Sequence, residues 1–360
     1  MKKTNFKKLV SVTLAIAMAA SLTACLGSGT AETTAAAADS SNDTEAVEST
    51  YTGKSYKLKM SSTVGEQSNA VVVAKAFADG VKAKTGGAVE ISVYASDQLS
   101  GGDMAKGVEN IQNGAIDCAF EPVDVMANLD KTLLTLSLPW TFDSYADAAA
   151  ALQGEGGAYI TKALDAKGIH TVGFIHNGFR QLTNSKRAVA TPEDIKNLKL
   201  RVPGGDVFMN FFKALGCDPV AMSFSELFTA LQQGTVDGQE NGFDLITTNK
   251  FYEVQKYITE WNYSYGAFAL VFNKATWDGF DDDLKTILLE EAEEACTLGN
   301  KNVEDSEADK IEICKTAGCE ITELTAEQIE AFKAVPEVQA YYTQMKELYG
   351  EEACKAFGIE

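Results

Sequence analysis

The chain has 360 residues, 45% of them hydrophobic, and a formal net charge of −20. This length predicts about two domains with sizeable cores. So large a surplus of acids repels nucleic acid and anionic membrane faces, which excludes nucleic acid as a partner. It also means that any anionic ligand must be held by a few placed cations.

The first 24 residues have the pattern of a secretion signal. Four lysines and no acids accompany an apolar run, Leu9 to Ala20, that is too short to span a bilayer comfortably. We therefore predict a signal peptide at residues 1–24. Once it is removed, 27 basic residues remain against 51 acidic ones, and the net charge becomes −24.

Leu22-Thr23-Ala24-Cys25 resembles the lipobox of bacterial lipoproteins, in which small residues precede a cysteine. The resemblance implies cleavage before Cys25 and lipidation of that residue, so that acyl chains anchor the protein to a membrane without spanning it. Ordinary secretion with a chance cysteine is the alternative. Residues 25–53 are rich in Ala, Ser, Thr and acids, and we expect them to form a disordered tether.

The remaining cysteines fit no zinc-binding pattern, and the chain has only two histidines, so neither a metal site nor a cofactor is predicted. Export permits disulfides. Cys314 and Cys319 are close enough in sequence for a local bridge, whereas Cys118 lies in an apolar run typical of a core. The pairing of six cysteines stays open: Cys118, Cys217, Cys296, Cys314, Cys319 and Cys354.

Strand and helix patterns alternate along the first part of the folded chain. Period-two and helical periodicity predict strands at 54–60, 89–94 and 116–120, with helices at 69–85 and 104–113 between them. This order indicates a parallel α/β sheet. Because ligands of open sheets bind beyond the carboxyl ends of the strands, one rim should carry Ser61-Ser62, Ser96 to Asp103 and Glu121.

The rest of the chain continues in the same style. We predict a helical region at 145–167 broken by glycines at 154–157, strands at 169–175 and 178–184, a short helix from Thr191-Pro192, a helix at 244–255, extended aromatic chain at 257–273, a long acidic helix from Asp281 to about Lys315, and helices within 325–357.

The segment from Leu198 to Asn241 is the most informative one. Arg201 lies in a short aliphatic strand that ends in Pro203-Gly204-Gly205. An arginine presents a planar fork of donors that matches the two oxygens of a carboxylate. On spacing alone, an ordinary exposed arginine at a strand end is the simpler interpretation.

Five phrases follow one another in this part of the chain: Arg180-Gln181-Leu182-Thr183-Asn184, Leu198-Lys199-Leu200-Arg201-Val202-Pro203, Ala214 to Val220, Met222 to Leu227, and Ala230 to Asn241. Together they resemble the TRAP transporter solute-binding family, the extracytoplasmic receptors of the C4-dicarboxylate and sialic-acid-binding type. The joint match is specific, although no single phrase is, and the resemblance extends from about Tyr56 to the C-terminus.

The resemblance implies an α/β fold of two lobes, like that of class II periplasmic binding proteins, with a ligand cleft between the lobes and a long helix that braces both. The first lobe would comprise residues 54–177 and 267–305, and the second lobe residues 178–266 and 306–360. The phrase Tyr263-Ser264-Tyr265-Gly266 would lie near a crossing point between them.

Carried over by position, Arg201 is expected to pair with the ligand carboxylate, and Arg180 to be the second arginine of the site. Asn241 would contact the same carboxylate through its amide, and Phe224 would form an apolar wall. Asp237 and Glu240 are expected to be structural.

On the first-lobe rim, Glu121 and Ser61 are expected to contact the distal part of the ligand, although each is also compatible with capping or solvating a strand end. The chain departs from the family where Gly242, rather than proline, follows Asn241, and where Gly204-Gly205 replaces a larger residue. Both changes remove bulk near the expected carboxylate, and the first lobe also differs around Thr63 to Asn69. The ligand's identity therefore stays open.

The leading hypothesis is a lipid-anchored receptor, monomeric and outside the cytoplasm, that delivers a small organic acid carboxylate to the membrane permease subunits of a TRAP-type secondary transporter. Alternatives are a binding protein for an ABC importer or a sensor, and a secreted hydrolase. The chain has no Gly-x-Ser-x-Gly elbow and no metal-ligand cluster, so we do not predict an enzyme. Its sequence leaves the coupling ion open.

Overall fold

The computed structural model describes residues 51–359 of the chain. The predicted signal peptide, Cys25 and residues 25–50 of the predicted tether lie outside the described residues. Within residues 51–359, no helix is both long and apolar enough to cross a membrane. The six cysteines of this part are all free, so Cys314 and Cys319 form no bridge in the structure.

Among the described residues, nine strands form one mixed sheet in the order β2-β1-β3-β8-β4-β7-β5-β6, with β9 paired to β8. Strands β2, β1 and β3 pair in parallel, as predicted, and strands β6, β5 and β7 form a second parallel group. The strands are β1 (Tyr56–Ser62), β2 (Val89–Tyr94), β3 (Cys118–Pro122), β4 (Ile169–Asn184), β5 (Lys199–Val202), β6 (Asp218–Ala221), β7 (Gly238–Asn241), β8 (Tyr257–Asn273) and β9 (Glu320–Glu323).

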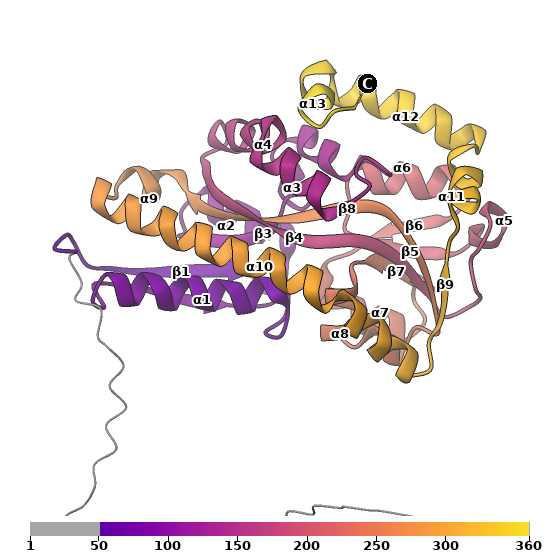
Figure 1. Cartoon of the computed structure of the whole chain (residues 1–360), viewed down its shortest axis with the longest axis horizontal. Coiled ribbons are helices and arrows are strands. Elements are labelled where there is room, and N and C mark those ends of the chain that lie inside the picture. The colour runs from indigo at the N-terminus through magenta and orange to yellow at the C-terminus, as the bar shows by residue number, and fades with distance from the viewer. Residues whose placement is uncertain (1–50, 360) are drawn as a thin grey trace, which may run out of the picture. The chain divides into compact units, whose positions relative to one another are not determined.

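The two parallel groups belong to the two lobes, and the antiparallel pair of β4 and β8 runs through both (Figure 1). The strands predicted at 169–175 and 178–184 are one strand, β4, which corrects the sequence-based division. The pairing shifts register between His176 and Gly178, and Gly178 has φ 100°. Only glycine adopts this backbone without strain, so the strand bends there, opposite Gly266, instead of ending.

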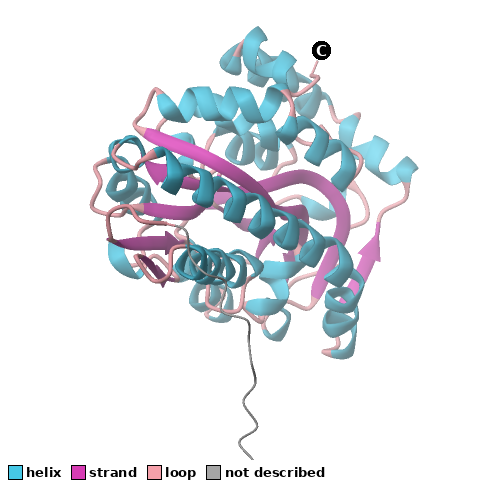
Figure 2. Ribbon diagram, turned by 60° about the vertical axis from the view of Figure 1, so that its left-hand side comes forward, coloured by secondary structure: helices cyan, strands magenta, loops and turns pink. Residues whose placement is uncertain are grey.

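Helices cover the sheet on both sides (Figure 2). Along β8, Ala267, Ala269 and Val271 pack into one core and Phe268, Leu270 and Phe272 into another, as the period of two requires. The helices are α1 (Asn69–Lys84), α2 (Met104–Gln112), α3 (Tyr145–Gln153), α4 (Glu155–Asp165), α5 (Pro192–Ile195), α6 (Asp206–Ala214), α7 (Phe224–Gln232), α8 (Phe243–Thr248), α9 (Lys274–Asp278), α10 (Asp282–Thr316), α11 (Ala326–Lys333), α12 (Pro336–Tyr349) and α13 (Glu351–Ala356).

The long helix α10 braces both lobes, as predicted. It has 35 residues, which corresponds to roughly 50 Å at about 1.5 Å per residue. It packs against α1 along its first part, crosses β4 near its middle, where His176 N donates to Asn300 Oδ1, and contacts α8 near its end, at Lys310 (Figure 1). The helix predicted at 244–255 is shorter: α8 ends at Thr248 because Lys250 takes a left-handed conformation, with φ 55°, before a 3₁₀ turn.

Candidate ligand-binding site

The carboxyl ends of the parallel strands in the two lobes meet along a seam. Ser225 Oγ, at the start of α7, donates to the carbonyl oxygen of Gly102 in the first lobe at 2.7 Å. A cavity of about 360 Å³ opens on the seam, lined by Asp124 from one side and by Gly204 and Met222 from the other. Since ligands of open α/β sheets bind at these strand ends, the seam is the candidate site.

Arg201 is a buried cation that makes no ion pair among the described residues. It belongs to β5 and is 1% exposed. Its Nε and Nη2 donate to the carbonyl oxygen of Met222 at 3.0 and 2.7 Å, which uses two of the five N–H donors of a guanidinium. Burial lowers the pKa of Arg201 to about 10, and the charge of Glu240 opposes this decrease. Arg201 therefore stays charged at neutral pH, and its remaining donors suit an anion.

The ring of Phe224 lies against this guanidinium. Cζ of Arg201 is 5.7 Å from the ring centroid, within the range of a cation–π contact. Phe224 begins α7 and is half-buried. It packs against both cores of the first lobe and against one core of the second. An apolar wall therefore stands beside the free donors, where the lobes meet.

Arg180 differs from Arg201 because the protein itself supplies its counter-charge. Both Nε and Nη2 of Arg180 donate to the carboxylate of Glu240, and the distance from Nη2 to Oε1 is 2.9 Å. The hydroxyl of Tyr263 donates to the same carboxylate at 2.6 Å. Asp124 Oδ2 lies 3.7 Å from Nη1 of Arg180. Burial lowers the pKa of Arg180, but Glu240 more than offsets this and holds it above its usual value.

The chain has three arginines, and two of them share this site. Arg180 lies close enough that its charge lowers the pKa of Arg201. Glu240, which was expected to be structural, holds Arg180 in place. The structure therefore brings both predicted arginines together and leaves the net positive charge on Arg201.

Asn241 lies between the two arginines, since β7 pairs with both β4 and β5. It is 2% exposed. Its Oδ1 accepts from Nη2 of Arg180 at 3.3 Å, and its Nδ2 donates to Gln239 Oε1 at 2.5 Å. An amide nitrogen carries two donors, so one hydrogen of Asn241 remains for a ligand.

On the first-lobe side, Ser61 and Glu121 are fully buried at the ends of β1 and β3. Glu121 Oε2 accepts from Thr63 Oγ1 at 2.6 Å. Glu121 Oε1 and Ser61 Oγ have no partner among the described residues. Burial raises the pKa of Glu121 well above its ordinary value, and the charges of Asp97 and Asp124 add to this. Neither side chain reaches solvent, and the bond from Thr63 to Glu121 is compatible with the alternative that Glu121 caps a strand end.

Three further residues of the site are not singled out by the sequence pattern: Asp97, Asp124 and Tyr263. Asp97 lies within the predicted rim and is 1% exposed, and Asp124 follows β3 closely. Both are acids just after strand ends, which is the signal that identifies Glu121. No local signal exists for Tyr263, because its partner Glu240 is 23 residues away.

At the two places where the chain departs from the family pattern, its glycines are required by backbone conformation or by close approach of another segment. Gly204 and Gly205 have φ of 116° and 79°, and a Cβ on Gly205 would lie 2.8 Å from Leu134 Cδ1. A Cβ on Gly242 would lie 2.7 Å from the carbonyl oxygen of Asn177. Gly242 thus lets β7 approach the crossing strand, whereas Gly204 and Gly205 line the cavity.

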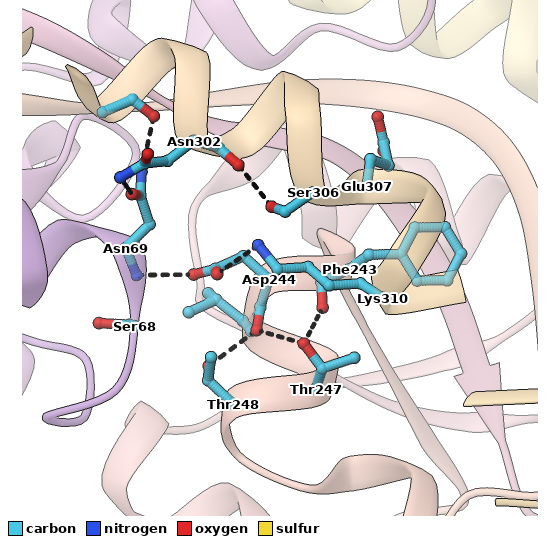
Figure 3. Close-up of polar contacts among 12 residues, drawn as sticks. Ser68, Asn69, Phe243, Asp244, Thr247, Thr248, Asn302, Ser306, Glu307 and Lys310 are labelled. Carbon is cyan, nitrogen blue, oxygen red and sulfur yellow. Dashed lines mark hydrogen bonds and ion pairs between the residues drawn. The ribbon is translucent and has the colours of Figure 1, made fainter. Parts of the chain in front are cut away.

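A second contact between the lobes lies at the junction of α1, α8 and α10 (Figure 3). Asp244, in the first turn of α8, accepts from the backbone N–H of Asn69 at 3.1 Å and from Lys310 Nζ at 2.8 Å. Asn69 is the first residue of α1, and its side chain bonds to α10 through Gly299 and Asn302. Asp244 therefore joins the N-terminus of a first-lobe helix to the second lobe.

Comparison with known proteins agrees with this geometry. The family model of the bacterial extracellular solute-binding proteins, family 7, matches residues 60–348. The chain is similar to the 2,3-diketo-L-gulonate-binding periplasmic protein YiaO of Escherichia coli K12, with 30% identity over 250 residues, or 69% of this chain and 76% of that protein.

Two solved structures share the fold. The sugar acid binding protein DctPAm from Advenella mimigardefordensis, in complex with galactonate, has a TM-score of 0.81 and 28% identity, over 84% of this chain and 97% of that one. A TRAP periplasmic solute binding protein from Sulfurospirillum deleyianum, with bound succinate, has a TM-score of 0.78 and 28% identity, over 86% and 100%. These neighbours are two-lobed binding proteins and not enzymes.

Proposed function

Since this chain belongs to family 7 of the bacterial extracellular solute-binding proteins, we propose that it is the receptor of a TRAP-type transporter, which binds a small organic acid outside the cytoplasm and passes it to the membrane permease subunits. The observation that carries the proposal is the buried guanidinium of Arg201, which makes no ion pair among the described residues. The galactonate and succinate complexes of its structural neighbours support the same class of ligand.

The ligand carboxylate binds at the free edge of Arg201. Met222 fixes the guanidinium from one side, which leaves both hydrogens of Nη1 and one hydrogen of Nη2 directed away from Met222. Asn241 supplies a further donor, and Phe224 excludes water from the contact. In a dry, closed cleft, such charge-assisted bonds are stronger than in water. Arg180 positions Asn241 and, through Nη1, faces Asp124.

Binding closes the two lobes over the acid, and the strands β4 and β8 bend where Gly178 faces Gly266. The predicted lobe boundaries at 177/178 and 266/267 coincide with this pair of glycines. The closed form is the one that the permease recognises. The receptor acts as a monomer.

We place the receptor on the outer face of a membrane, anchored by lipid on Cys25. Support for the anchor comes from the sequence alone: the lysine-rich start, the apolar run and the small residues before Cys25. The acyl chains hold the receptor near the permease, and residues 25–53 give it reach.

A thermal-shift panel tests the function. Dicarboxylates, sialic acids, uronates and aldonates are added to the purified protein, and a cognate acid raises its melting temperature by mass action. Arg201→Ala should abolish this shift, because losing one partner of a buried charge pair costs roughly 2–5 kcal/mol. Arg187→Ala is the matched control, because Arg187 is exposed and its side chain donates to the backbone carbonyl oxygens of Asp194 and Lys196. If sugars or amines bind and no acid does, the proposal is wrong.

A further inference from the structure

The strand ends of the first lobe carry a cluster of buried polar atoms that lack partners. Four oxygens have none among the described residues: Ser61 Oγ, Ser62 Oγ, Asp97 Oδ1 and Glu121 Oε1. Each of these residues is at most 1% exposed. Leaving a buried polar atom without a hydrogen bond costs about 1–3 kcal/mol. Such atoms together indicate that a polar ligand completes the cluster.

Three of the four oxygens, those of Ser61, Asp97 and Glu121, belong to one place in the fold, whereas Ser62 faces the other side of β1 because side chains alternate along a strand. The backbone N–H of Asp97 donates to the carbonyl oxygen of Ser62 at 3.0 Å. Thr63, the next residue, donates to Glu121 at 2.6 Å. Asp97 is also held in a left-handed backbone conformation, with φ 51°. Asp97, Thr63 and Glu121 therefore lie together at the ends of β1, β2 and β3, and Ser61 lies on the same face of its strand as Thr63.

This distal subsite adjoins the arginine end of the seam. Asp124 bridges the two, because it lies 3.7 Å from Arg180 and its charge raises the pKa of Glu121. Asp103 lines the cavity with Asp124 and is near enough to raise the pKa of Asp97. Asp103 and Asp124 therefore place the Asp97 and Glu121 cluster beside the cavity on the seam.

The arginine end and the distal end of the proposed site differ in charge: the first offers a cation, and the second offers only acids and hydroxyls. At the arginine end, Arg201 is a guanidinium without an acid partner, while Glu240 and Asp124 already face Arg180. At the distal end, neither Asp97 nor Glu121 forms an ion pair with any described residue. Burial raises the pKa of Asp97 to about 6. A second carboxylate of a ligand would find no cation there, and any negative charge on Asp97 or Glu121 would repel it.

We propose that the ligand is a monocarboxylate with hydroxyl groups at its other end, and that Asp97, Glu121 and Ser61 bind these hydroxyls. This inference rests on the proposed function and narrows it. Carboxyl oxygens accept from a ligand hydroxyl, and serine hydroxyls donate to it, so both kinds of atom in the cluster are satisfied. An ammonium group only donates, and it would give the hydroxyl hydrogen of Ser61 no acceptor.

Acids of equal length that differ only at the distal end test the proposal. Erythronate, succinate, butyrate and 4-aminobutyrate each have four carbons, and galactonate and adipate each have six. Calorimetric titration of the purified receptor should show that a hydroxy acid binds at least tenfold more tightly than the dicarboxylate of the same length. An equal or tighter affinity for succinate, adipate or 4-aminobutyrate would overturn the inference.

Two isosteric variants test whether Asp97 and Glu121 are the residues that recognise the ligand hydroxyls. Asp97→Asn and Glu121→Gln should each weaken binding of the preferred hydroxy acid at least tenfold and change butyrate binding less than threefold. Glu109→Gln, on the exposed face of α2 in the same lobe, is the control and should change neither. Circular dichroism and melting temperature verify that each variant folds. If both variants bind the hydroxy acid like the wild type, the subsite assignment fails.

The outcomes also separate this inference from the proposed function. If the receptor prefers a dicarboxylate, and Arg201→Ala abolishes that binding, the function stands and only the distal assignment is wrong. If no acid of either length or of the wider panel binds, both are wrong.

Discussion

Arg201 donates two hydrogen bonds to one backbone oxygen, that of Met222, at 3.0 and 2.7 Å. The two residues come from neighbouring parallel strands, since Met222 directly follows β6. A carbonyl oxygen fixes the orientation of the guanidinium without neutralising its charge. The contact therefore prepares Arg201 for an anionic ligand, whereas the pairing of Arg180 with Glu240 removes that capacity from Arg180.

Orientation as well as charge should matter at Arg201. We expect Arg201→Lys to weaken binding of the cognate acid at least tenfold, because an ammonium is a point charge and cannot bond both to Met222 and bidentately to a carboxylate. Calorimetric titration measures the change. A lysine variant with wild-type affinity would show that a positive charge alone suffices.

The buried pair of Arg180 and Glu240 should dominate the stability of the second lobe. Glu240→Gln leaves Arg180 with a weaker partner and should lower the free energy of unfolding by roughly 3–5 kcal/mol. Urea unfolding measures it. Glu352→Gln breaks the exposed pair with Lys162 and should leave the stability nearly unchanged. If the two variants are equally stable, the buried network is not the stabilising element inferred here.

Asp244 should hold the lobes together before ligand arrives. Asp244→Ala removes the acceptor for the N–H of Asn69 and the partner of Lys310, so the open form gains population. The expected result is a larger radius of gyration in X-ray scattering without ligand and a several-fold weaker affinity. Asp305→Ala, which loses only an exposed ion pair on α10, is the control and should resemble the wild type in both measurements.

The pH dependence of stability should report on Asp97. Burial raises its pKa from 3.8 to about 6, so its folded state holds a proton that the unfolded chain has released. The resulting stability is fully present below about pH 4 and is lost as the pH rises through about 6. The groups that face Asp97 are Thr63, Asp103 and Glu121, and the raised pKa of Glu121 acts in the same direction.

Ligand-free Asp97→Asn should therefore be more stable than the wild type at pH 7, by about 2–3 kcal/mol for a shift of this size. The difference should shrink as the pH falls towards 4. Urea unfolding at pH 7, 5.5 and 4 gives the unfolding free energy of both proteins. Comparing the two at each pH removes the effect of the overall negative charge, which they share. If the difference in unfolding free energy between the two proteins stays constant from pH 7 to pH 4, the raised pKa assigned to Asp97 is contradicted.

The lipid anchor depends on one atom, the sulfur of Cys25. Cys25→Ser should release the protein from the membrane fraction into the soluble extracytoplasmic fraction, and radiolabelled fatty acid should no longer be incorporated. Cys217→Ser, at a partly buried thiol of the folded part, should stay in the membrane fraction. Retention of the Cys25 variant would place the anchor elsewhere.

Much of the fold is predictable from the sequence, because periodicity and capping are local. Nearby residues determine three of its features: the order of strands and helices from β1 to β3, the break between α3 and α4 at Gly154, and the N-cap of α10 at Asp281. The continuity of β4 through Gly178 does not follow from nearby residues, because it depends on pairing with β8. Strands β6 and β7 are not predicted, because Asp218–Ala221 and Gly238–Asn241 lack the run of aliphatic residues that marks β5.

The sequence by itself determined the family and much of the order of the elements, and it predicts Arg201 as the binding cation, since these depend on phrases along the chain. Only the tertiary structure decided which arginine is free. Glu240, Tyr263 and Asp124 reach Arg180 from three separate segments, and Asp97 and Glu121 meet only through strand pairing. In a buried site, distances of a few ångströms set the charge balance, and sequence spacing does not encode those distances.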